Sequence, residues 1–151
     1  MKAKKLTLIS IVLLAGILVG AVAIMGSSAK ELKLKVKWTP RNYAISSPVP
    51  NPWNAELYFA PPRPLDDIDP TTILLEGMYA PISDPYPSTH TARLIVPFDG
   101  YDVLMLVLLK AGHVTPGEYR VYLEITGQLD DGTPFAGEGG INLIVPEPNG
   151  P

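Results

Sequence analysis

The sequence contains no cysteine and only two histidines among its 151 residues. Without cysteine the chain can form no disulfide, thiolate metal site or cysteine nucleophile, so the fold must be stabilised by packing alone. No serine lies in a nucleophile-elbow pattern such as G-x-S-x-G. We therefore predict that the protein is not an enzyme. A small extracellular hydrolase is kept only as a minor alternative, because paired carboxylates can meet in the fold without any sequence motif.

Charge is absent from residues 6–26, LTLISIVLLAGILVGAVAIMG, and three lysines precede this stretch. About 20 apolar residues can cross the ~30 Å hydrocarbon core of a bilayer, whereas the apolar part of a signal peptide is usually about 7 to 15 residues long. The small residues Ser27, Ser28 and Ala29 instead fit cleavage by a signal peptidase. We expect residues 1–29 to be a cleaved signal peptide or a retained membrane anchor, and the protein to be extracellular or at the cell surface.

Basic residues are scarce after position 29. Three of the 12 basic residues precede the apolar segment, which leaves nine against 15 acidic residues, a net charge of −6. A nucleic-acid partner needs a basic surface and is therefore not expected.

Short segments of alternating apolar and polar residues, separated by many of the 17 prolines and 13 glycines, fill residues 30–146. Such a pattern predicts an all-β fold, an immunoglobulin-like antiparallel sandwich, because each strand must be ended by a turn. One short helix is expected over residues 101–111, with Asp99 or Asp102 near its start and Gly112 at its end. Residues 147–151 are expected to be a disordered tail. The strands are expected at residues 31–38, 53–60, 72–77, 91–98, 117–127 and 133–146.

Three pieces of the chain, residues 66–77, 92–112 and 117–145, resemble in this order an immunoglobulin-like β-sandwich module that recurs in secreted and surface proteins of archaea and bacteria. The third piece is the most specific: a strand ending in TG is followed by LDDGTPFAG and a closing hydrophobic strand. The resemblance implies a structural, adhesive or stalk unit rather than an enzyme. Such modules often have an Asp-rich loop before the strand that matches residues 91–98, but this chain has SDPYPSTH there.

Two groups of residues are candidate binding sites. Asp66, Asp67 and Asp69 are the densest acidic cluster, and several converging oxygens suit calcium. Capping of the turn before Pro70 is the favoured role for these carboxylates, and no cofactor is required by the sequence. Aromatic residues beside the proline-rich connections, chiefly Trp53, Tyr58 and Tyr86, are candidates for stacking on a carbohydrate or anchoring a protein, although packing against prolines is the favoured explanation.

The first strand after the leading segment suggests a route to assembly. In ELKLKVKW, residues 31–38, the apolar side chains share one face and alternate with charged ones. A strand at the start of a sandwich can complete the sheet of a neighbouring copy. We therefore expect a structural or interaction protein that binds a partner or itself, as in a filament or an adhesin, with a carbohydrate-binding module as the alternative. The assembly residues would be Leu32, Leu34, Val36 and Trp38.

Overall fold

The structure, a computed structural model, describes residues 30–148. Residues 6–26, which carry the prediction of a signal peptide or membrane anchor, lie outside this range, as does most of the predicted tail. Over residues 30–148 no helix is long and apolar enough to cross a bilayer.

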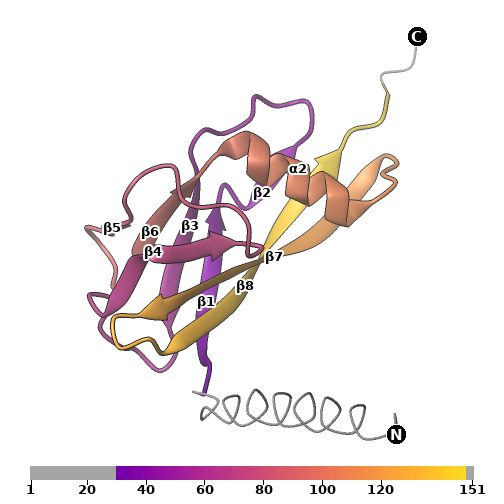
Figure 1. The fold of residues 1–151 in the computed structure, drawn as a ribbon. Helices are drawn as coiled ribbons and strands as arrows, with labels where there is room; N and C mark the ends of the chain where they lie inside the picture. Colours follow the sequence, from indigo (N-terminus) through magenta and orange to yellow (C-terminus); the bar gives the residue numbers. More distant parts are fainter. Residues whose placement is uncertain (1–29, 149–151) are drawn as a thin grey trace, which may run out of the picture.

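The fold is mostly β with one short helix, as predicted (Figure 1). Prolines and glycines separate the strands, because proline lacks the amide hydrogen that a sheet requires. In chain order the elements are β1 (Leu32–Thr39), β2 (Asn42–Ala44), β3 (Trp53–Phe59), β4 (Ile68–Leu75), β5 (Tyr86–Pro87), β6 (Leu94–Phe98), α2 (Gly100–Ala111), β7 (Gly117–Leu129) and β8 (Pro134–Val145).

The strands form one curled sheet in the order β4-β7-β8-β1-β3-β6-β5, and β2 also pairs with β8. β1 joins the two halves of this sheet, since it is antiparallel to β3 and parallel to β8. After a turn at residues 40–41 the chain continues as β2, which stays parallel to β8. The prediction of a wholly antiparallel sheet is therefore wrong: β1 and β2 run in the same direction as β8, and the sheet is mixed.

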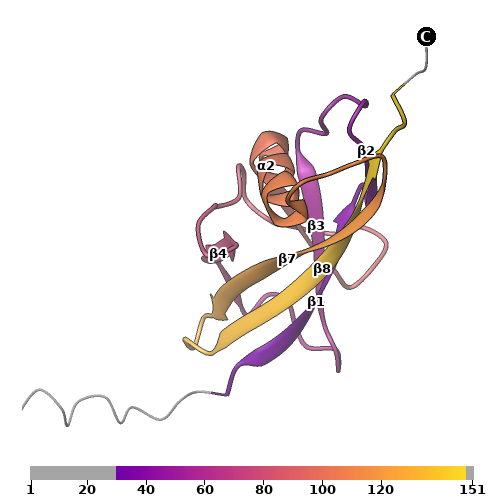
Figure 2. The ribbon, with the colours of Figure 1, turned by 90° about the vertical axis from the view of Figure 1, so that its right-hand side faces the viewer.

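Glycines in β8 allow β1 to lie close to it. A Cβ atom on Gly137 would be 2.2 Å from the carbonyl oxygen of Leu34, and one on Gly139 would be 2.7 Å from that of Val36. Glycine is required at both positions because the two backbones are in close contact. Figure 2 shows β1 beside the long twisted hairpin of β7 and β8.

The hydrophobic core lies inside the curl and beneath α2. Phe59 of β3 and Phe135 of β8 meet edge to face with ring centroids 6.1 Å apart, so side chains from both halves of the sheet share this core. Among residues 30–148 no polar or charged residue is fully buried. The largest fully buried side chains are Trp38, Trp53, Phe98 and Phe135.

The predicted helix is confirmed as α2. The side chain of Asp99 accepts hydrogen bonds from the amides of Tyr101 and Asp102, and Gly112, with φ of 72°, ends the helix. The short strands β2 and β5 were not predicted. β4 begins four residues before the expected position 72, and β6 begins three residues after the expected position 91.

Candidate functional site

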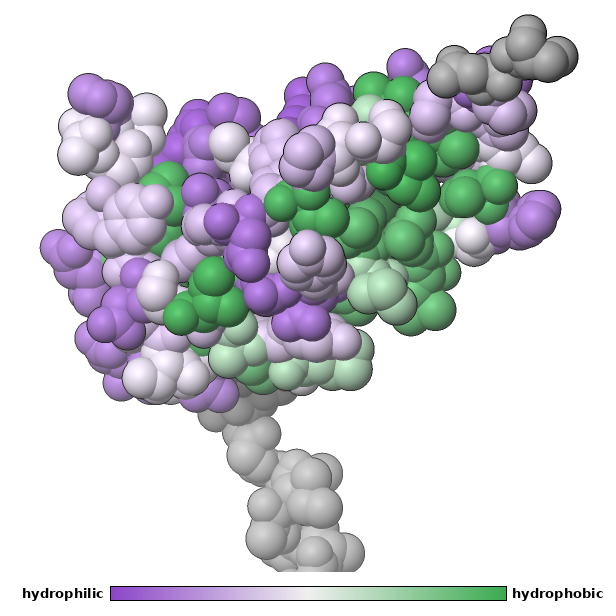
Figure 3. Space-filling view, turned by 90° about the horizontal axis from the view of Figure 1, so that it is seen from above, coloured by the Kyte–Doolittle hydropathy of each residue, from purple (hydrophilic) through white to green (hydrophobic). Residues whose placement is uncertain are grey.

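Large apolar side chains on α2 remain exposed to solvent. Tyr101, Met105 and Leu109 are 64%, 63% and 76% exposed, respectively. Their spacing of four residues places them along one side of the helix, while Val103 and Val107 on the other side enter the core. We call these three side chains the α2 face. Figure 3 shows apolar residues gathered on the side of the molecule that carries α2.

An ion pair fixes the C-terminal end of α2 on the sheet. The Lys110 ammonium donates to Glu76 Oε1 at 2.7 Å and to the carbonyl oxygen of Tyr122 at 3.1 Å. Glu76 also accepts a hydrogen bond from the Glu124 amide, so one carboxylate joins the turn after β4, the helix and β7. The side chain of Met78, in that same turn, is also exposed. The C-terminal end of the α2 face is thus tied to the sheet through Lys110 and Glu76.

Comparison with known proteins gives no indication of what this surface binds. No family model, curated protein or solved structure matches the chain.

The predicted assembly strand lies in the sheet of its own chain. Leu34 and Trp38 are buried in the core, and Leu32 and Val36 pack against it. β1 is hydrogen-bonded to β3 along most of its length and to β8 at its start. Assembly by strand addition would require this strand to leave both neighbours, and it remains a prediction.

The candidate aromatic residues occupy three different environments. Trp53 is fully buried: its indole nitrogen donates to the carbonyl oxygen of Pro40 at 2.9 Å, and its ring packs against that of Tyr43. The expectation that Trp53 is exposed to a ligand is therefore wrong. Tyr58 is half-buried beneath the Arg93 guanidinium, 5.0 Å from its ring centroid. Tyr86, in β5, is exposed.

The acidic cluster does not form a metal site. Asp69 Oδ1 accepts hydrogen bonds from the amide and the hydroxyl of Thr71, and the backbone oxygen of Asp67 accepts one from the Asp130 amide. Within the part of the chain that the structure describes, no three His, Cys, Asp or Glu side chains are placed to hold a metal ion. A calcium site at Asp66, Asp67 and Asp69 is therefore not supported, and Asp69 has the predicted turn-capping role.

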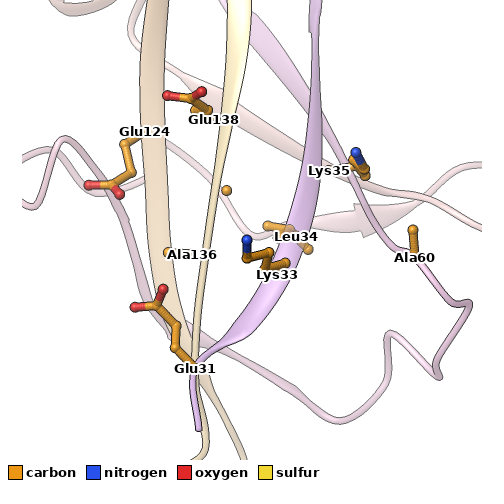
Figure 4. Close-up of a pocket in the computed structure, with 9 residues that line it drawn as sticks. Glu31, Lys33, Leu34, Lys35, Ala60, Glu124, Ala136 and Glu138 are labelled. Atoms are coloured by element: carbon orange, nitrogen blue, oxygen red, sulfur yellow. The ribbon is translucent and has the colours of Figure 1, made fainter.

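A shallow groove of about 550 Å³ runs between β1 and the β7–β8 hairpin (Figure 4). Glu124 and Glu138 extend from the hairpin, and Lys33 extends from β1. Three carboxylates and two ammonium groups line the groove, from Glu31, Glu124, Glu138, Lys33 and Lys35, so neither sign of charge dominates it.

Proposed function

We propose that this protein is a non-catalytic extracellular structural protein, an immunoglobulin-like sandwich whose copies join through the α2 face. The exposed row of Tyr101, Met105 and Leu109 is the observation that carries the proposal. Of the eight large apolar side chains exposed within residues 30–148, these three lie on one helix. Contiguous exposed apolar surface on a domain generally marks a contact with another molecule.

The pairing of the strands supports the immunoglobulin-like part of the proposal. β5, β6, β3 and β1 form one half of the curled sheet, and β4, β7, β8 and β2 form the other. The first part of the chain is divided between the halves, as β1 pairs with β3 and β2 pairs with β8. Two such halves enclosing a common core have the layout of a sandwich with Greek-key connections.

The sequence of α2 supports a second copy as the partner. Two α2 helices that pack antiparallel about a two-fold axis at Met105 bring Tyr101 of each copy beside Leu109 of the other. The two helix dipoles then oppose each other, so that the positive end of each helix lies beside the negative end of the other.

The orientation of the domain fits display at a surface. β1 begins at the end of the domain remote from α2 (Figures 1 and 2). If residues 6–26 stay in the membrane as an anchor, α2 therefore points away from that membrane, towards other copies or other cells. If the segment is cleaved, the same face is available in the released protein.

Substitution of Met105 tests this proposal. A glutamate there would place a charge at the centre of the apolar contact, so the M105E full-length chain should sediment as a monomer and the wild type as a dimer. The matched control is Ile82→Glu, which also adds a carboxylate at an exposed apolar residue but lies outside α2. A wild-type chain that is monomeric at all concentrations, or an M105E chain that remains dimeric, would refute association through the α2 face.

A further inference from the structure

Three cationic residues converge on a pocket that the proposed self-association does not use. Lys37, Arg41 and Arg120 line a pocket of about 260 Å³, together with the half-buried ring of Tyr58. The pocket lies at the turn between β1 and β2. Here the chain stops pairing with β3, at the end of β1, and begins to pair with β8 as β2. Three of the nine basic residues in this acidic part of the chain thus meet at one place.

The floor of the pocket depends on a glycine. Gly140 lies opposite Tyr122 in the β7–β8 pairing, and a Cβ atom added to it would be 2.9 Å from Arg120 Nε. The missing side chain lets the Arg120 guanidinium lie across β8 towards β1. Arg120 Nε donates to the Tyr122 hydroxyl at 3.0 Å, which holds the guanidinium in this position.

The opposite wall is fixed by the backbone. The carbonyl oxygen of Arg41 accepts a hydrogen bond from the Asn142 amide at 2.8 Å, so the turn that carries Arg41 is tied to β8. Arg120 also donates to the Asn142 side chain at 3.4 Å. Both arginines are therefore hydrogen-bonded to Asn142 of β8, so the two walls of the pocket are tied to one residue.

The positive charge of the pocket is only partly balanced. None of the described residues that line it carries a carboxylate. The Glu56 carboxylate lies 3.6 Å from the Lys37 ammonium, and it also accepts hydrogen bonds from Arg93 and Thr39. Glu56 is thus shared among Lys37, Arg93 and Thr39, and no carboxylate is paired with Arg41 or Arg120 within residues 30–148.

We infer that this pocket binds the carboxylate of an acidic sugar. Arginine presents several N–H groups in a plane and pairs with oxyanions through two parallel hydrogen bonds, which selects an anion over a neutral molecule. The pocket is smaller than typical drug-sized cavities, so it suits one sugar ring rather than a long ligand. Tyr58 also lines the pocket and adds aromatic surface beside the cations.

Titration calorimetry of the full-length chain with D-glucuronate tests the inference, with D-glucose as the neutral control. Binding of glucuronate should weaken by about tenfold or more in R41Q and in R120Q, because each loses a charged hydrogen bond to the ligand. Arg63→Gln removes the same charge outside the pocket and should change the affinity less than about twofold, as expected for an exposed, screened charge. Gly140→Ala alters the floor without changing any charge, and it should also weaken binding.

Three results would overturn the inference. One is the absence of heat with glucuronate at any concentration, and another is equal binding by R63Q, R41Q and R120Q, which would mean attraction to overall charge only. The third is preference for a glutamate peptide or for inorganic phosphate over glucuronate, which would assign the pocket to a different anion. None of these results bears on the α2 face, because the pocket shares no residue with it.

Discussion

The indole nitrogen of Trp38 donates a hydrogen bond to the carbonyl oxygen of Gly139, 3.1 Å away and buried in the core. The two residues lie 101 positions apart, on β1 and β8. Because regular pairing of these two strands covers only residues 32–33 of β1, this hydrogen bond extends the connection beyond their paired segment. The contact joins the two halves of the sheet where the backbones of β1 and β8 pass close to each other.

The close approach of β1 and β8 makes Gly137 sensitive to substitution. A Cβ atom there would be 2.2 Å from the Leu34 carbonyl oxygen, which belongs to the backbone and cannot rotate away. We expect Gly137→Ala to lower the free energy of unfolding by about 3 kcal/mol, as overpacking does. Gly140→Ala, three residues further along, would meet only the flexible Arg120 side chain and should cost less than about 1 kcal/mol. Urea denaturation of both variants checks this, and equal losses would contradict the explanation.

The helix cap gives a second prediction. Asp99 accepts hydrogen bonds from the amides of Tyr101 at 2.8 Å and Asp102 at 3.3 Å. Asp99→Ala should destabilise the domain by about 1 kcal/mol, because these amides lose their acceptor. Asp99→Asn keeps an acceptor oxygen and should retain most of the stability. If thermal unfolding shows that the asparagine and alanine variants are equally destabilised, capping by the side chain is not the cause.

The helix and the long strands could be predicted because their signals are local. The helix at residues 101–111 is preceded by an acidic cap, Asp99, and followed by Gly112. The strands at residues 117–127 and 133–146 have a strong alternation of apolar and polar side chains. β2 and β5 have two or three residues and exist only through their pairing with β8 and β6, so no periodic pattern reveals them. Trp53 begins β3 within the strand predicted at residues 53–60, and its buried ring packs on Tyr43, so it is not available to a ligand.

The candidate sites were harder to predict than the fold. To predict the α2 face one must know which side of the helix meets the core, because residues 103–109 are all apolar and the sequence there marks no polar side. The basic pocket joins residues 37, 41 and 120, which only the fold brings together. The role of Gly140 beside Arg120 depends on the register of β7 and β8, which the sequence alone does not reveal.

The ion pairs of Glu56 predict how stability depends on pH. Burial alone would raise the pKa of this carboxyl, but hydrogen bonds from Arg93 and Thr39 and the charge of Lys37 outweigh burial and lower the pKa below 4.5. A carboxyl whose pKa is lower in the folded state stabilises the fold above its unfolded value, and this contribution is lost as the pH falls through the folded value.

Glu56→Gln should therefore destabilise the domain by about 1 kcal/mol at pH 7 and show less further loss than the wild type on acidification below pH 4.5. Urea denaturation as a function of pH measures both effects. Glu138→Gln, at an exposed position on β8, is the control for loss of a carboxylate. Parallel pH profiles for wild type and E56Q would contradict the role assigned to Glu56.

A disulfide between β1 and β3 separates the two routes to assembly. Lys35 and Tyr58 are directly paired across these strands, and the natural chain has no cysteine that could compete. Oxidised K35C/Y58C would keep β1 in its own sheet. Association through the α2 face predicts that the oxidised and reduced proteins form the same dimer by sedimentation. Assembly by strand addition predicts that oxidation abolishes it.

The most direct test of self-association through α2 is a single cysteine at Met105 in the full-length chain, in intact cells under mild oxidation. A two-fold axis at this residue brings the two thiols of a dimer within reach of a disulfide. We predict a dimer on a non-reducing gel for Met105→Cys and a monomer for Ile82→Cys, which is also exposed but lies off the helix. A monomer for M105C, or equal crosslinking of both variants, would contradict the account.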